Sequence, residues 1–123
     1  NYTFFTFSRN PYHRIISAFF YKNPSKTISD FKYFCKHQLV KYNFDLFFNR
    51  HYVHYYPQYL FLCDKNYNNV PEIKVNKLEL HDNPRIYNLN EYLDDECIEI
   101  INNIYKRDFE LFDYQMIITM NTN

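Results

Sequence analysis

The sequence of 123 residues contains no glycine and no tryptophan. Glycine makes up about 7% of an average protein. Both the Walker phosphate loop and the glycine-rich dinucleotide fingerprint require it, so these two nucleotide-binding loops are excluded. Turns that need a positive φ must instead use asparagine or aspartate, the next most tolerant residues.

Long apolar runs and paired cysteines are also missing. No segment approaches the roughly 18 continuous apolar residues of a transmembrane helix, so no membrane span is predicted. The N-terminus begins directly in an expected strand, so we expect no signal peptide. Cys35, Cys63 and Cys97 are odd in number and widely separated. They predict no disulfide framework, and their number does not decide between an oxidising and a reducing compartment.

The residues that are present indicate one folded domain covering residues 1–123. Hydrophobic residues make up 46% of the chain and aromatic residues 22%, which argues against disorder. The net charge is zero, but residues 1–50 carry 8 Lys/Arg and 2 Asp/Glu, whereas residues 51–123 carry 6 and 12. The basic half suits an anionic ligand, although solvated surface lysines would give the same asymmetry.

The segment from Phe4 to Lys22 carries the predictions on which the functional interpretation of the sequence depends. An aromatic run over Tyr2–Phe7 predicts a buried strand. Asn10 is a good N-cap and Pro11 fits the first helical position, so a helix is predicted over Pro11–Lys22. Its apolar side chains fall on one face of this helix.

The opposite face of that helix, with the turn before it, predicts an anion site. Arg9 lies in the turn, while Arg14 and Ser17 are neighbours on the polar face. Helix N-termini attract anions, and arginine offers a fork that matches phosphate. Ser17 could instead bond its own helical turn, and Arg14 could instead pair with an acid.

The later elements alternate between helix and strand. We expect a helix from Ile28 to about Val40 with a Thr27–Asp30 capping box, strands at Tyr59–Cys63 and Glu72–Leu80, a helix at Leu89–Phe112, and a further strand within Gln115–Asn123. The predicted fold class is therefore α/β, with a short parallel sheet flanked by helices.

The stretch Tyr42–Gln58 is rich in aromatic residues and histidine but has no clear period. Such loops often line ligand grooves, because a tyrosine offers both a ring face and a hydroxyl. We assign the stretch to the side that binds an acceptor sugar. A loop packed over the core would explain the same composition.

A family resemblance follows from the first segment. The pattern Arg9-x-Pro11-x-x-Arg14-x-x-Ser17-x-Phe19 resembles the 3′-phosphate-binding motif of sulfotransferases, particularly the Golgi carbohydrate sulfotransferases. The resemblance implies that Arg9 and Ser17 hold the 3′-phosphate of the donor, 3′-phosphoadenosine 5′-phosphosulfate, and that Arg14 can add to this site. It further implies a P-loop-like sulfotransferase fold and a Golgi lumenal or membrane-anchored protein.

Three later segments agree with this family in the right order. They are His54-Tyr55-Tyr56-Pro57-Gln58, Lys77-Leu78-Glu79, and Ile104-Tyr105-x-x-Asp108-Phe109-x-x-Phe112-x-Tyr114. Asp113 stands where the family commonly has glycine. The first motif is fairly specific, whereas each later segment is weak alone.

One departure concerns the loop that binds the 5′-phosphosulfate. In the family this loop and its lysine lie upstream of the 3′-phosphate motif, and here only eight residues precede Arg9. We expect the chain to be the C-terminal part of a longer enzyme, in preference to a degenerate relative.

Sulfuryl transfer needs a base that takes the proton of the acceptor hydroxyl. His54 is the best candidate for this catalytic role, and Glu79 is a weaker one. No metal is expected, because His51, His54 and Cys63 do not form a recognised zinc pattern.

The leading hypothesis is a sulfotransferase that moves sulfate from the nucleotide donor to a carbohydrate hydroxyl. The alternative is a non-catalytic module that keeps a nucleotide or anion site. A single-strand nucleic-acid binder is a third possibility, but the neutral charge and the lack of an RNA-binding signature argue against nucleic acid as a partner.

Overall fold

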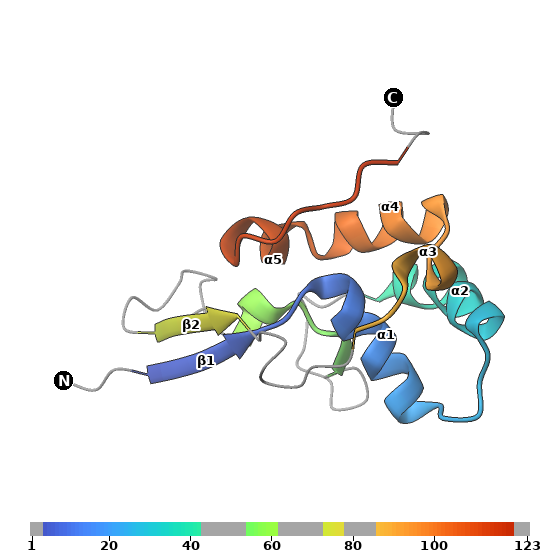
Figure 1. The fold of residues 1–123 in the computed structure, drawn as a ribbon, viewed down its shortest axis with the longest axis horizontal. Helices are drawn as coiled ribbons and strands as arrows, with labels where there is room; N and C mark the ends of the chain where they lie inside the picture. Colours follow the sequence, from blue (N-terminus) through green and yellow to red (C-terminus); the bar gives the residue numbers. More distant parts are fainter. Residues whose placement is uncertain (1–3, 43–53, 62–72, 78–85, 120–123) are drawn as a thin grey trace.

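The computed structural model describes residues 4–42, 54–61, 73–77 and 86–119 (Figure 1). Its strands are β1 (Phe4–Ser8) and β2 (Ile73–Lys77), its helices are α1 (Pro11–Lys22), α2 (Ile28–His37), α3 (Leu89–Tyr92), α4 (Asp95–Ile104) and α5 (Lys106–Leu111), and its 3-10 turns include η1 (Leu39–Lys41) and η3 (Gln58–Phe61).

The prediction of an α/β fold with a sheet flanked by helices is wrong. The described part of the chain is predominantly helical. Its strand content is one short parallel pair, β1 with β2, in which Ser8 lies opposite Lys77. The buried core is formed by helices packed on helices, and this pair stands at one end of them (Figure 1).

Two expected strands, at Tyr59–Cys63 and within Gln115–Asn123, are not strands over the residues that the structure describes, 59–61 and 115–119. The segment predicted as Tyr59–Cys63 begins as the 3-10 turn η3, because the N–H of Tyr59 donates to a carboxylate oxygen of Asp108, at 2.8 Å, and not to a neighbouring strand. From Gln115 to Thr119 the backbone is irregular. Aromatic and β-branched composition alone cannot distinguish such segments from strands.

The helix α1 has the predicted bounds, and its caps explain them. The Asn10 side chain accepts from the N–H of Tyr12 at 3.0 Å, Pro11 takes the first position, and the Asn23 N–H closes the last turn on the Phe19 carbonyl. Its buried face consists of Pro11, Tyr12, Ile15, Ile16 and Phe19. These side chains anchor the helix in the core.

The helix α2 begins with the predicted capping box. The Thr27 hydroxyl accepts from the Asp30 N–H at 3.2 Å, and the Asp30 carboxylate accepts from the Thr27 N–H at 2.8 Å. The helix ends at His37 and not near Val40, because the chain tightens into the 3-10 turn η1.

The predicted long helix Leu89–Phe112 is instead three helices. Leu93 has extended backbone between α3 and α4, and Asp94 then caps α4 by accepting from the Cys97 N–H at 2.9 Å. Tyr105 separates α4 from α5. Asp113 follows α5 with a φ of 57°, so aspartate takes the left-handed state at the position where glycine is common in the resembled family.

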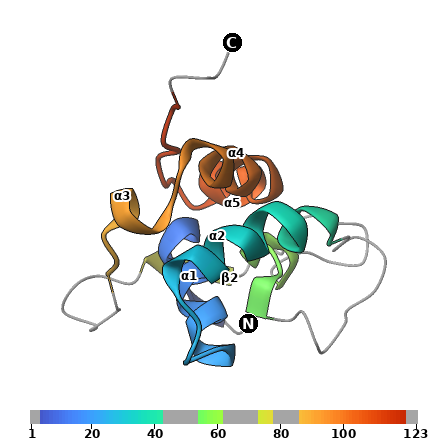
Figure 2. The same ribbon diagram turned by 90° about the vertical axis from the view of Figure 1, so that its right-hand side faces the viewer.

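In Figure 2, α4 and α5 lie above α1 and α2. The helix α2 contacts α4, α1 contacts α3, and α5 contacts η3. The ring of Tyr12 on α1 lies 5.0 Å from that of Phe109 on α5, centroid to centroid. The start of α1, where the candidate site lies, therefore packs against the C-terminal part of the chain.

Candidate functional site

Arg9 lies in the turn between β1 and α1, and its backbone is held by Gln58. The Arg9 N–H donates to the Gln58 side-chain oxygen at 2.9 Å, and the Gln58 side-chain amide donates to the Arg9 carbonyl at 2.7 Å. Two bonds between the same residues fix the turn in one orientation. The position of the guanidinium therefore depends on a residue far along the chain.

Gln58 is held in turn by Asp108. The fully buried Asp108 carboxylate accepts from the Gln58 N–H at 2.6 Å and from the Tyr59 N–H at 2.8 Å. Burial raises the pKa of Asp108, and the two N–H bonds and the charge of Arg14 partly oppose this rise. The chain of contacts Asp108 to Gln58 to Arg9 links α5 to the turn before α1.

Arg14 has a structural partner that neither sequence interpretation anticipated. Its Nη1 donates to the backbone carbonyl of Tyr56 at 2.6 Å. Burial lowers the pKa of Arg14, while Tyr105 and Asp108 raise it. The guanidinium thus holds the segment 54–58 against α1.

Ser17 lies in the second turn of α1, the helix that follows the Arg9 turn. At about 100° per residue, Ser17 falls between His13 and Arg14 around the helix. The positive charge of Arg9 contributes to lowering the pKa of both His13 and Arg14, so its guanidinium is near both. Arg9 therefore lies in the turn before α1, and Arg14 and Ser17 lie in the first two turns of that helix.

His13 is a site residue that sequence reasoning missed. Its Nδ1 accepts from the Tyr87 N–H at 3.1 Å, and its ring stacks on that of Tyr87 with centroids 6.3 Å apart. Burial and the charge of Arg9 lower the pKa of His13, which favours the neutral ring. Because Nδ1 accepts, the proton of that ring is on Nε2, and His13 is a hydrogen-bond donor at this atom.

Only the spacing of four residues from Arg9 and from Ser17 could have indicated His13 in advance. Its tautomer is fixed by Tyr87, which no local pattern connects to the first helix. Tyr87 and Tyr114 also flank Arg9. Burial lowers the pKa of Arg9, and these two tyrosines offset part of the effect. The Tyr114 hydroxyl lies 3.0 Å from the Ser8 hydroxyl at the end of β1.

His54 is not brought to the Arg9 turn. It is exposed, and its ring lies 5.7 Å from that of Tyr21 near the end of α1. The rise of about 1.5 Å per residue puts Tyr21 roughly 18 Å along the chain axis from Arg9. Glu79, Cys63 and His51 lie outside the described residues. Within the described ranges, no group of three His, Cys, Asp or Glu side chains could hold a metal ion.

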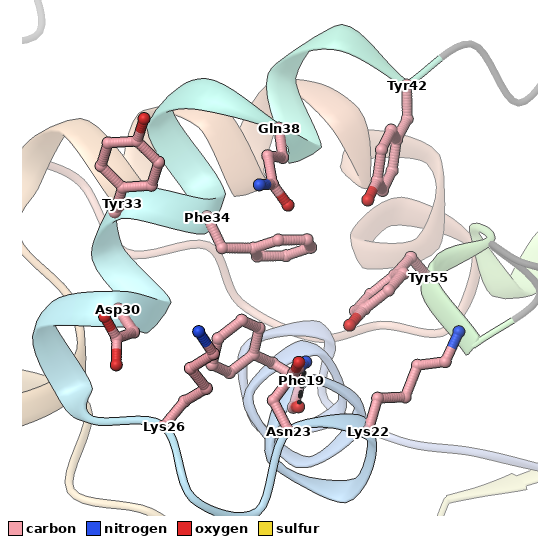
Figure 3. Close-up of a pocket in the computed structure, with 10 residues that line it drawn as sticks. All are labelled: Phe19, Lys22, Asn23, Lys26, Asp30, Tyr33, Phe34, Gln38, Tyr42 and Tyr55. Atoms are coloured by element: carbon pink, nitrogen blue, oxygen red, sulfur yellow. Dashed lines mark hydrogen bonds between the residues drawn. The ribbon is translucent and has the colours of Figure 1, made fainter.

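A cavity of about 710 Å³ lies at the C-terminal end of α1 (Figure 3). It is lined by Phe19, Lys22, Asn23, Lys26, Asp30, Tyr33, Phe34, Gln38, Tyr42 and Tyr55. Arg9, Arg14 and Ser17 are not among these residues. Tyr42 and Tyr55 belong to the aromatic stretch, which therefore contributes to a cavity as well as to the core, where Tyr55 and Tyr56 are buried.

No family model, curated protein or solved structure matches this chain. The resemblance to sulfotransferases therefore rests on its own motif residues and their order. Among the described residues, no helix has the length and apolar character needed to cross a membrane.

Proposed function

We propose that this chain is part of a sulfotransferase that moves sulfate from 3′-phosphoadenosine 5′-phosphosulfate to a carbohydrate hydroxyl. The observation that supports it best is the Asp108–Gln58–Arg9 linkage. It joins residues from three of the four segments that resemble the family. Independent chance matches would have no reason to meet around the same arginine.

The donor's 3′-phosphate would bind where α1 begins. The Arg9 guanidinium supplies charge and a fork of donors, and the Ser17 hydroxyl leans toward the helix N-terminus, as helical side chains do. The His13 Nε2–H adds a neutral donor on the same face. Each charge-assisted bond contributes about 1.5–3 kcal/mol.

The acceptor would bind in the cavity at the other end of α1. The rings of Tyr42 and Tyr55 offer faces for sugar stacking, and the ammonium groups of Lys22 and Lys26 suit an acidic sugar. The Lys22 ammonium lies 5.8 Å from the centre of the Tyr55 ring. His54, which precedes Tyr55 in the chain, is still proposed as the general base, although it does not line this cavity and its ring lies against Tyr21.

Transfer itself is largely a matter of placing the reacting groups in line and neutralising charge. We assign no residue of this chain to the lysine-bearing loop that binds the 5′-phosphosulfate. We therefore expect the 123-residue chain to bind adenosine 3′,5′-bisphosphate weakly and to show no turnover. If turnover is also missing when an upstream loop is supplied, the non-catalytic anion-binding module becomes the better description.

The test is calorimetry with two nucleotides. Adenosine 3′,5′-bisphosphate should bind at least about tenfold more tightly than adenosine 5′-monophosphate, because only the first carries the 3′-phosphate. Arg9→Lys should remove most of this difference, since a point charge cannot replace the fork. The matched control is Arg107→Lys, which changes an exposed arginine on α5. Equal affinity for both nucleotides would refute the site.

A further inference from the structure

Two of the three cysteines meet in the core. Cys35 on α2 and Cys97 on α4 are both fully buried and both free thiols in the structure. The two helices pack directly against each other. Neither a motif nor the spacing of the cysteines predicts this pair, because the two residues are far apart in the chain.

Polar contacts fix the register of the two helices at this point. The ammonium of Lys36, next to Cys35, lies 2.6 Å from an Asp94 carboxylate oxygen. The other oxygen of Asp94 accepts from the Cys97 N–H at 2.9 Å. One carboxylate therefore links the residue next to Cys35 to the backbone of Cys97, and this holds α2 and α4 together at the two cysteines.

The two thiols hydrogen-bond to each other. This bond and burial raise the pKa of Cys35. The same bond, donated by Cys35, lowers the pKa of Cys97, which also lies in the first turn of α4. Thiols at helix N-termini ionise more readily, so Cys97 is the better nucleophile and Cys35 the thiol that resolves.

We propose that Cys35 and Cys97 form a disulfide that joins α2 to α4. This inference does not depend on the proposed sulfotransferase activity. Two buried thiols could instead serve only as small apolar packing groups. The Lys36–Asp94–Cys97 linkage favours the disulfide, because it holds the two packed helices together at the position where both buried thiols lie.

The oxidant is a disulfide of the glutathione type. The Cys97 thiolate attacks one of its sulfur atoms, a mixed disulfide forms, and one glutathione thiolate leaves. The Cys35 thiol then loses its proton and attacks the Cys97 sulfur, which releases the second glutathione thiol. Two electrons pass to the oxidant. Since both thiols are buried, the exchange takes place while the chain folds or when α2 and α4 separate locally.

The experiment uses the full 123-residue chain, refolded with glutathione disulfide. After denaturation and alkylation, we expect the chain to carry one alkyl label, on Cys63, whereas the reduced chain carries three. Digestion should yield one linked pair of peptides, carrying Cys35 and Cys97. The melting temperature should rise by roughly 10 °C over that of the reduced chain, as expected for a bridge closing a long loop.

The matched controls separate this bond from others. Cys63→Ala should keep the linked peptides and the thermal shift, whereas Cys35→Ala/Cys97→Ala should lose both. If the double variant does not fold, peptide mapping of the unmodified chain still decides. Recovery of Cys35 and Cys97 as free thiols, or a bridge from either to Cys63, would overturn the proposal.

Discussion

The two ends of α1 are built in different ways. The N-terminal end is held by hydrogen bonds from residues far along the chain, with Asp108 and Gln58 around Arg9. The C-terminal end faces a cavity bounded by α2, which is held by its own capping box and by a partly exposed ion pair. The first end is therefore rigid and non-local, whereas the second depends on local contacts that water can screen.

The largest expected effect is at the rigid end. Asp108→Ala would leave the N–H groups of Gln58 and Tyr59 without their carboxylate acceptor in a buried place. We expect a loss of about 3 kcal/mol in the free energy of unfolding, measured by urea denaturation. Glu110→Ala, at an exposed position on the same helix, should change it by less than about 0.5 kcal/mol. A loss for Asp108→Ala no larger than the control's would remove the contrast between the two ends.

The second effect concerns Asp94, which caps α4 and pairs with Lys36 of α2. Burial alone would raise the pKa of Asp94, but the Lys36 and Cys97 hydrogen bonds together lower it to about 2. A folded pKa below the ordinary value of about 3.9 means that the stabilisation is complete above pH 4 and is lost as the pH falls toward 2.

Asp94→Ala should therefore cost about 1–2 kcal/mol near neutral pH and almost nothing near pH 2. Denaturation curves across this pH range would measure it. Asp94→Asn is the matched control, because asparagine keeps a cap and removes only the charge. A cost that stays constant with pH would show that the ion pair contributes nothing.

A smaller effect is expected at the capping box of α2. Thr27→Ala removes the hydroxyl that accepts from the Asp30 N–H. The melting temperature should fall by a few degrees, since N-caps have modest effects. Thr27→Ser keeps an acceptor and should change it little. If both variants melt alike, the cap does not support the cavity end.

The smallest effect tests the neighbourhood of Arg9. The guanidinium contributes to lowering the pKa of His13. Arg9→Gln should raise that pKa while leaving the Tyr87 N–H bond to Nδ1 in place. An NMR titration of the His13 ring would record the change, with His37 as the internal reference on α2. An unchanged His13 pKa would place the Arg9 side chain away from α1.

The sequence predicted the local features and missed the non-local ones. The bounds of α1 and the capping box of α2 follow from caps and periodicity within a few residues. The bond from Arg14 to the Tyr56 carbonyl, and the role of Asp108, depend on segments that meet only in the folded chain. The C-terminal helix divides at Leu93 because Asp94 is the N-cap of a new helix, which the apolar period over Leu89–Phe112 does not reveal.

The α/β prediction failed for a related reason. A short apolar and aromatic segment such as Tyr59–Cys63 predicts a strand, yet a strand also needs a partner for its N–H groups. At Tyr59 that partner is the Asp108 carboxylate, so the segment turns. Arg9, Arg14 and Ser17 lie within nine residues of one another, so their neighbourhood follows from helical spacing, whereas the contacts of His13 depend on Tyr87.

Asp113 occupies a backbone conformation that glycine usually takes, in a chain that contains no glycine. With a φ of 57°, an L-residue occupies a backbone region that costs roughly 1–2 kcal/mol for a side chain with a β-carbon. Most added glycines loosen a protein, but here the exchange would remove a steric penalty from the folded chain. This aspartate is thus the one described position with a positive φ at which greater backbone freedom would make the protein harder to unfold.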